Sequence, residues 1–284
     1  MNNKPVLFLD SGIGGILYCS DFLKKNPYEE ICYIADRKHF PYGQRGKEEL
    51  ISILLSLTEK ILKEIDPKII VLACNTATVS ALDSLRKTFA HVPFVGTVPA
   101  IKPAAAQSKK RKIGLLGTSR TIEDPYNLHL VDCASCIDVS GEAQSENNSD
   151  EKRCEIISVA APDLVEFIEK QFDKADENEK TAIVKKYINI FLNEVADCIV
   201  LGCTHFLYLL DIFKREAAPS IAVYDSLDGI TKRIEFLLNE RNSFHAQEET
   251  KRASRRLMLT GNEPPDASWQ KRADSLGFKL SLFN

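Results

Sequence analysis

The chain has 284 residues, and its 37 Lys and Arg side chains stand against 40 Asp and Glu side chains, which gives a formal net charge of −3. This near-neutral balance argues against a nucleic-acid-binding protein held by bulk charge. Its 44% hydrophobic and 27% charged residues are ordinary for a globular protein of about two domains, and they exclude fibrous and disordered classes.

Cysteine content and apolar runs indicate where the chain belongs in the cell. Eight cysteines in 284 residues are too few for a disulfide-stapled scaffold. The apolar run that starts at Val6 is interrupted by Asp10 and has no cleavage site after it, so it does not form a secretory signal. No apolar stretch approaches the roughly 18 residues of a membrane span. We therefore expect a cytoplasmic chain with reduced thiols and no membrane partner.

Short apolar runs alternate with segments of helical periodicity, which is typical of parallel sheets covered by helices. In chain order, the expected strands are 6–9, 31–35, 69–73, 94–96, 113–116, 198–201, 221–224 and 257–260. Amphipathic periodicity predicts helices over 47–64, 181–196 and about 266–276. The polar stretch 140–153 lacks any periodicity and is expected to be an exposed loop.

Three strand ends in the first part of the chain are repeated, in the same order, in the second part. Residues 70–76 (IVLACNT) resemble 199–205 (IVLGCTH), and two further pairs match: 6–11 with 113–119, and 95–97 with 224–226. The repeats indicate two similar α/β halves. Because ligands of open α/β sheets bind at the carboxyl ends of strands, two such ends facing each other would enclose a ligand between two thiols.

The two thiols of the repeat belong to Cys74 and Cys203, each placed after a strand and before an expected helix. The positive end of a helix favours the thiolate. A lone cysteine in this position is more often a buried structural residue, but the matching contexts of the pair favour a functional role. His205 follows Cys203 by two residues and is close enough to tune that thiol or to protonate a carboxylate.

A glycine-rich turn, Asp-Ser-Gly-Ile-Gly-Gly, begins at Asp10. It is not a dinucleotide fingerprint, because the third glycine should fall at position 17, which is Leu17. A carboxylate would repel a phosphate, whereas it suits a ligand ammonium group or a neighbouring thiol. Asp10 is therefore a candidate site residue, with a helix N-cap as the alternative.

Neutral donors that could bind carboxylates cluster at the predicted junctions between strands and helices, although such groups are more often caps. The turn at Pro41, Tyr42 and Gly43 could also close over a ligand carboxylate, although it is most simply a turn. The candidate donors at the junctions are Asn75, Thr76, Thr118, Thr121, Thr204 and Ser226.

Motifs for other chemistry are weak or missing in the sequence. Cys133 and Cys136 have redox or metal spacing, but no second pair accompanies them, so we expect no metal site. A single-nucleophile protease has no use for two equivalent cysteines. Proton transfer does: one thiolate removes a proton from a carbon acid, and the other thiol returns a proton to the opposite face, which inverts the configuration.

Taken together, these motifs resemble the glutamate racemases, cofactor-independent enzymes that supply D-glutamate for peptidoglycan. The resemblance also includes the Ala35-Asp36 and Asp225-Ser226 pairs, and it spans nearly the whole chain in order. It implies an isomerase with an α/β fold of two pseudo-symmetric three-layer αβα domains, mainly parallel sheets and the active site at their interface. We place the first domain at 1–97 plus 208–284 and the second at 98–207.

The resemblance also implies roles for individual residues. The catalytic cysteines fall on Cys74 and Cys203; Asp10 assists the first, while His205 and an acidic residue, Glu169 or else Glu166, assist the second. The substrate-holding groups fall on Asp10, Ser11, Tyr42, Gly43, Asn75, Thr76, Thr204 and His205. Beside these, Pro41, Thr118 and Thr121 stay candidate substrate-binding residues.

The resemblance further implies glutamate as substrate, no pyridoxal phosphate, no metal and a homodimer. The family usually has Cys at the position of Ala161 and Tyr-Pro at Phe206 and Leu207. These departures leave both thiols in place. The alternatives are an aspartate or hydantoin racemase of the same superfamily, and a non-catalytic module that binds an amino acid or a protein.

Overall fold

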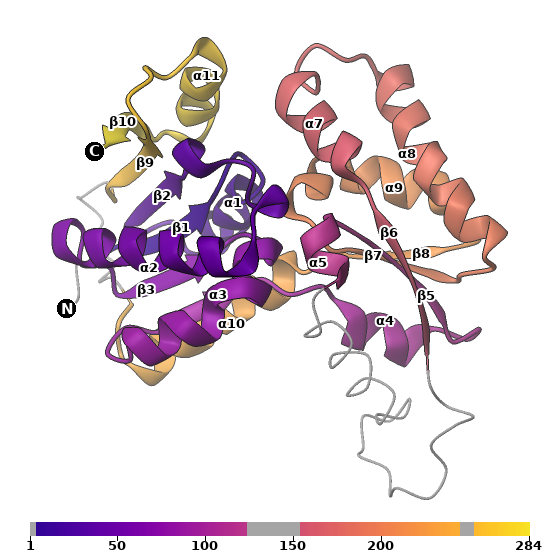
Figure 1. Cartoon of the computed structure of the whole chain (residues 1–284), viewed down its shortest axis with the longest axis horizontal. Coiled ribbons are helices and arrows are strands. Elements are labelled where there is room, and N and C mark those ends of the chain that lie inside the picture. The colour runs from indigo at the N-terminus through magenta and orange to yellow at the C-terminus, as the bar shows by residue number, and fades with distance from the viewer. Residues whose placement is uncertain (1–3, 124–153, 245–252) are drawn as a thin grey trace, which may run out of the picture. The chain divides into compact units, whose positions relative to one another are not determined.

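A computed structural model describes residues 4–123, 154–244 and 253–284 (Figure 1). The expected loop at 140–153 and the Cys133/Cys136 pair lie outside the described residues. The chain divides into two compact units, the first comprising Met1–Thr97 and Leu227–Asn284 and the second Val98–Ser226. The boundaries between the units follow Thr97 and Ser226, whereas the sequence analysis places the second boundary after Leu207.

The first unit contains a six-stranded parallel sheet in the order β10-β9-β2-β1-β3-β4. Its strands are β1 (Val6–Asp10), β2 (Ile31–Ala35), β3 (Ile69–Leu72), β4 (Phe94–Gly96), β9 (Arg255–Thr260) and β10 (Lys279–Phe283). Strands β1, β2, β3 and β4 agree with the expected strands, and β10 was not expected. The expected α/β class with mainly parallel sheets is confirmed in this unit.

Helices cover both faces of the first sheet, as Figure 1 shows. Its α-helices are α1 (Ile16–Lys25), α2 (Lys47–Glu64), α3 (Asn75–Thr88), α10 (Leu227–Glu240) and α11 (Ala267–Leu276). Leu50, Leu54 and Ile61 of α2 pack with α3 against Leu7 and Leu9 of β1. Because successive side chains of a strand point to opposite faces, Phe8 packs on the other side, against Phe22 of α1. Short 3₁₀ turns, η1 (Arg37–His39) and η2 (Tyr42–Gln44), follow β2.

The second unit contains a four-stranded parallel sheet in the order β6-β5-β7-β8. Its strands are β5 (Lys112–Gly117), β6 (Glu155–Ala160), β7 (Cys198–Leu201) and β8 (Ala222–Tyr224). Its helices are α4 (Ile101–Gln107), α5 (Ser119–Glu123), α7 (Pro162–Lys170), α8 (Glu177–Asn193), the 3₁₀ turn η4 (Thr204–Leu209) and α9 (Leu210–Ala217). The later boundary of this unit has a physical reason, since β8 pairs with β7 and extends the second sheet.

The order of the second sheet repeats the order β2-β1-β3-β4 within the first. β5 thus corresponds to β1, β7 to β3 and β8 to β4, which are the three pairs that the sequence repeats predict. The structure adds a fourth pair, β2 and β6. The two pseudo-symmetric α/β halves are therefore confirmed, and equivalent strand ends carry Cys74 and Cys203.

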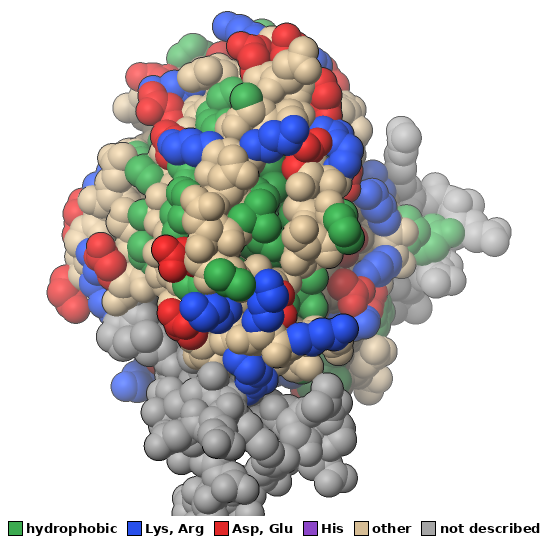
Figure 2. Space-filling model, turned by 90° about the vertical axis from the view of Figure 1, so that its right-hand side faces the viewer, with side chains coloured by type: hydrophobic (Ala, Val, Ile, Leu, Met, Phe, Trp, Pro, Cys, Tyr) green, Lys and Arg blue, Asp and Glu red, His purple; other side chains and the backbone are tan. Residues whose placement is uncertain are grey.

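The surface fits the near-neutral net charge. Basic and acidic side chains are interspersed on the face drawn in Figure 2, with hydrophobic side chains between them. In the described part of the chain, no helix combines the length and the apolar character that crossing a membrane requires.

Candidate active site

Cys74 lies at the end of β3 and is the N-cap residue of α3, with an extended backbone (φ −145°, ψ 119°). Its side chain is buried, and its carbonyl accepts the first helical hydrogen bond, from the amide of Thr78 at 3.0 Å. The thiol therefore lies at the amino-terminal end of a 14-residue helix. The partial positive charge of that helix end stabilises a thiolate.

Asp10 ends β1, next to β3, and is completely buried. Its Oδ1 accepts hydrogen bonds from the Gly12 amide at 3.1 Å and the Ser11 hydroxyl at 3.3 Å. These bonds fix the carboxylate in its own turn. The N-cap of α1 is Gly15, so the alternative that Asp10 caps this helix is wrong.

Close packing explains why the last residue of the turn, Gly15, is a glycine. A Cβ atom on Gly15 would lie 2.7 Å from the Cβ of Ala73 and 3.0 Å from that of Asp10. Those residues precede Cys74 and carry the buried carboxylate. Gly15 thus lets the turn lie directly against the end of β3, and this contact brings the Asp10 and Cys74 segments together.

Tyr42 is buried on η2, between Pro41 and Gly43, and its hydroxyl donates a hydrogen bond to Asp36 Oδ2 at 2.7 Å. Burial raises the pKa of Tyr42 well above its usual value, and the negative charges of Asp36, Cys74 and Asp10 raise it further. Tyr42 therefore remains a neutral donor beside the thiol. Sequence reasoning missed Asp36 as a site residue, although its place directly after β2 was a signal.

Asn75 has the clearest unmet hydrogen-bonding capacity of this group. Its side chain is 3% exposed, and neither its amide nitrogen nor its amide oxygen has a partner among the described residues. Leaving a buried amide unpaired costs about 1–3 kcal/mol. The next residue, Thr76, is equally buried. A polar ligand beside Cys74 would satisfy the Asn75 amide. We call Asp10, Ser11, Tyr42, Cys74 and Asn75 the Cys74 cluster.

Cys203 occupies the equivalent position in the second unit. It follows β7, precedes η4 and has nearly the same backbone conformation (φ −138°, ψ 136°). Its sulfur lies 3.7 Å from Nδ1 of the buried His205. Nε2 of His205 lies 2.5 Å from Oε1 of Glu169 on α7. We call Cys203, His205 and Glu169 the Cys203 cluster.

The partners of His205 decide its charge. Burial alone would lower the pKa of His205, but the hydrogen bonds with Cys203 and Glu169 raise it well above its usual value. The imidazolium is therefore flanked by two groups that can be negative. Glu166, the other candidate acid, instead pairs with Lys170 at 2.7 Å on the exposed side of α7. Glu169 is the carboxylate that contacts His205.

The other candidate donors of the second unit also lie at strand ends. The Thr118 hydroxyl accepts a hydrogen bond from the amide of the buried Thr121 at 3.2 Å, and the two hydroxyls are 2.9 Å apart. These bonds are those of a helix cap, the alternative considered for such residues. Thr204, next to Cys203, and Ser226, after β8, are both buried.

The remaining buried thiols show what a structural cysteine looks like in this fold. Burial raises the pKa of Cys32 on β2 to about 12 and that of Cys198 on β7 to about 12. Burial raises the pKa of Cys19 on α1 further still. Neutral thiols in apolar surroundings are inert. Among the described residues, no group of three or more His, Cys, Asp or Glu side chains is arranged to hold a metal ion.

Comparison with known proteins decides the family. The sequence model of the Asp/Glu/Hydantoin racemase family matches residues 24–233, well over half of the chain. The chain belongs to this racemase family. A glutamate racemase of Bartonella tribocorum is 32% identical over 283 residues, which are 99% of this chain and 96% of that protein. One of Shewanella sp. (strain ANA-3) is 33% identical over 258 residues, which are 90% and 87%.

Solved structures of the racemase family agree with this assignment. An Escherichia coli glutamate racemase, in complex with L-glutamate and the activator UDP-MurNAc-ala, matches with a TM-score of 0.79 and 25% identity, over 98% of this chain and 97% of that chain. A glutamate racemase isoform of Bacillus anthracis matches with a TM-score of 0.74 and 26% identity, over 100% and 97%. The resemblance and the fold predicted from the sequence are thereby confirmed.

The departures from the family motif are apolar and buried. Ala161 and Phe206 are completely buried, and Leu207 is nearly so. Ala161 precedes α7, which carries Glu169, and the other two follow His205 on η4. The polar groups of the Cys203 cluster itself are retained.

Proposed function

We propose that the protein interconverts L-glutamate and D-glutamate, using Cys74 and Cys203 as its two acid/base groups. The observation that carries the proposal is the repetition of a buried thiol at equivalent strand ends of the two units, each thiol with polar partners of its own. The likeness to glutamate racemases over nearly the whole chain supports glutamate as the substrate.

The chemistry proceeds in two proton transfers. The thiolate of one cysteine removes the α-proton, so that a C–H bond breaks and an S–H bond forms. The electron pair left on the α-carbon is delocalised into the substrate carboxylate. The thiol of the other cysteine then gives its proton to the opposite face, which inverts the configuration. The first cysteine ends as the thiol and the second as the thiolate, ready for the reverse reaction.

The partners of each thiol support these two roles in proton transfer. The His205 imidazolium, held by Glu169, stabilises a thiolate on Cys203. Asp10 assists Cys74. The unpaired amide of Asn75 binds the substrate, together with Ser11, Thr76 and Thr204. Fixed donors of this kind stabilise the substrate carboxylate as it takes up charge in the transition state.

The mechanism requires both sulfur atoms, one from each unit, to reach the same α-carbon. In glutamate racemases the product D-glutamate supplies peptidoglycan synthesis, and we assign this use to the protein. Assembly as a homodimer and a cytoplasmic location stay predictions.

Racemisation in heavy water tests the two-base mechanism. When L-glutamate is the substrate, the D-glutamate formed early should carry deuterium at the α-carbon, while the remaining L-glutamate stays protiated. This result is expected because the proton is returned by a thiol that has exchanged with the solvent. Deuterium entering both enantiomers at equal rates would show a single base and would contradict the proposal.

Circular dichroism of the same preparation tests the substrate. L-glutamate should lose optical activity, whereas L-aspartate and a chiral hydantoin should keep theirs. Turnover of aspartate or the hydantoin in place of glutamate would overturn the substrate assignment and leave the two-thiol chemistry intact. No optical change with any of the three would favour a non-catalytic binding module.

A further inference from the structure

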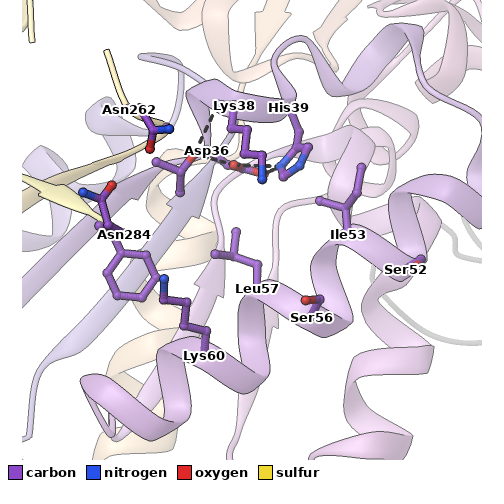
Figure 3. A pocket seen from close by; sticks show the side chains of 13 residues that line it. Asp36, Lys38, His39, Ser52, Ile53, Ser56, Leu57, Lys60, Asn262 and Asn284 are labelled. Atoms are coloured by element: carbon purple, nitrogen blue, oxygen red, sulfur yellow. Dashed lines mark hydrogen bonds and ion pairs between the residues drawn. The ribbon is translucent and has the colours of Figure 1, made fainter. Parts of the chain in front are cut away.

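A pocket of about 640 Å³ lies within the first unit and is lined by Asp36, which accepts a hydrogen bond from the buried Tyr42 (Figure 3). Three adjacent strands end at it: Asp36 directly follows β2, Thr260 ends β9 and Phe283 ends β10. Helix α2 forms the opposite wall. The volume is that of a small-molecule site, and the carboxyl ends of parallel strands are where such sites occur.

Two lysines and two serines of the pocket wall provide donors for an anion. Ser52, Ser56 and Lys60 lie four residues apart along α2 and line the pocket together. Lys38, on η1, contributes a second ammonium group and forms no ion pair with any residue that the structure describes. Among the residues that the structure describes, the ion-pair partner of Lys60 is Glu64, at 3.9 Å.

The one buried carboxylate of the pocket is already satisfied. Asp36 Oδ1 accepts a hydrogen bond from the Thr260 hydroxyl at 2.5 Å, and Oδ2 accepts one from Tyr42. The ring of His39 lies 2.8 Å from Oδ2 and covers the carboxylate. The lysines therefore remain available to a ligand.

The apolar floor of the pocket favours a ligand that carries an apolar group beside its anionic group. Ile53 and Leu57 of α2 are partly exposed within it. The Phe283 ring lies beneath Lys60, with the ammonium nitrogen 5.0 Å from the ring centroid. A ligand with a charged end at the lysines therefore has an apolar surface to cover. Two ammonium groups favour a doubly charged anion over a carboxylate.

We propose that this pocket binds a phosphate monoester of a small apolar or aromatic group, and that its occupancy affects the Cys74 cluster through Asp36. A ligand that contacts His39 or Thr260 changes the hydrogen bonds that Asp36 accepts. Asp36 in turn positions the Tyr42 hydroxyl beside Cys74. The binding site stands on the pocket alone, whereas its effect on the reaction rests on the proposed function.

Calorimetric titration of the full chain with phenyl phosphate tests the site. Lys60→Glu and Lys38→Glu should each weaken binding by about tenfold, which corresponds to about 1.4 kcal/mol. Lys63→Glu is the matched control, since Lys63 is exposed on the same helix and does not line the pocket, and it should bind as the unchanged protein does. Thermal unfolding of each variant verifies that it is folded.

The comparison ligands separate the parts of the proposal. Inorganic phosphate should bind more weakly than phenyl phosphate, because it lacks the apolar group, and phenol more weakly still. Absence of phenyl phosphate binding, equal binding of phenol, or equal weakening by Lys63→Glu would each overturn the site.

The effect of the occupied pocket on the reaction is tested separately, by glutamate kinetics. Saturating phenyl phosphate should change the KM for glutamate in the unchanged protein and leave it unaltered in Lys60→Glu. An unaltered KM in both proteins, with binding intact, would overturn the coupling alone. If the chain did not racemise glutamate at all, the titrations would still decide the binding site, so the two failures are distinguishable.

Discussion

The Cys74 and Cys203 clusters occupy equivalent places in two copies of one α/β plan, yet their thiols have different partners. Cys74 lies near a buried carboxylate, Asp10, and a neutral hydroxyl, that of Tyr42. Cys203 lies beside the imidazole of His205, which is held by Glu169. The repeat preserves the strand end, the thiol and the backbone conformation, whereas the assisting groups differ.

This difference places a carboxylate in the Cys74 cluster and an imidazole held by a carboxylate in the Cys203 cluster. A neighbouring carboxylate opposes a thiolate, whereas a neighbouring imidazolium stabilises it. Racemisation requires both the thiol and the thiolate at each sulfur, so the two clusters have to support the same two states with different neighbouring groups.

The largest effect should come from removing either thiol. Cys74→Ala and Cys203→Ala should each lower kcat by at least about 10³-fold, because a general acid or base contributes about 10²–10⁴-fold and each thiol serves in both roles. The matched controls are Cys32→Ala in the first unit and Cys198→Ala in the second, which remove the buried thiols of β2 and β7. Circular dichroism of glutamate turnover measures all four.

The controls should keep activity within about twofold and lose only stability, since they shorten a buried side chain by one atom. Substantial racemisation by Cys74→Ala or by Cys203→Ala would remove that cysteine from the mechanism. Equal losses in Cys198→Ala and Cys203→Ala would indicate that damage to the second sheet, and not the missing thiol, causes the effect.

A smaller effect should distinguish the two clusters. His205→Asn should lower kcat/KM by about 10²-fold, and Asp10→Asn by a similar amount, as expected for groups that adjust a proton transfer. Enantiomers have equal free energies, so kcat/KM must fall equally in both directions. The asymmetry appears instead in the primary isotope effect with α-deuterated glutamate.

His205→Asn should raise the isotope effect for the enantiomer whose proton Cys203 removes, and Asp10→Asn should raise it for the other enantiomer. The two variants thus serve as controls for each other. An isotope effect raised for the same enantiomer by both would contradict the assignment of one assisting group to each thiol.

A packing variant should have a more moderate effect on the Cys74 cluster. Gly15→Ala places a Cβ atom 2.7 Å from that of Ala73, so the end of β3 or the turn has to shift. Overpacking of this kind costs about 1–3 kcal/mol of stability, and displacement of Cys74 should lower kcat/KM by about tenfold. Gly46→Ala, where the added Cβ atom has nothing within 4 Å, is the control.

Urea unfolding and glutamate kinetics of both glycine variants measure the two effects. Gly46→Ala should retain both activity and stability. If Gly15→Ala behaved in the same way, the close approach of the turn to Ala73 would be irrelevant to the site.

The sequence predicts the central strands well because their apolar runs are continuous, and α2 begins and ends at the expected residues, Lys47 and Glu64. It misses β6 and β10, which are edge strands with mixed burial and carry a weaker apolar signal. α8 begins before the expected position 181, because Asp176 and Glu179 form a capping box ahead of its apolar stripe.

The residues of the site also divide into those that the sequence predicts and those that it misses. Both thiols and Asp10 are evident because each lies at the end of a buried strand. The contact between His205 and Glu169 joins residues 36 positions apart, and only the resemblance suggested it. Asp36 was missed because its role depends on Tyr42 and Thr260, and Thr260 is brought to it by the pairing of β2 with β9. Such pairings depend on the order of the strands.

The smallest expected effect is a pH dependence of the unfolding free energy, which also distinguishes the two clusters. The pKa of His205 is raised in the folded protein, so the folded state keeps a proton that the unfolded chain releases above about pH 6.5. The stability from this group is therefore fully present below that pH and is lost as the pH rises toward the folded pKa. Its slope cannot exceed about 1.4 kcal/mol per pH unit for one proton.

His205→Asn should remove this slope, so its unfolding free energy in urea should fall less between about pH 6.5 and 8.5 than that of the unchanged protein. His91→Asn, at an exposed histidine of the first unit, is the control and should leave the slope in place. Equal slopes in His205→Asn and the unchanged protein would mean that His205 carries no additional proton in the folded state. Cys203 would then lack a cationic neighbour, and the two clusters would no longer differ in this respect.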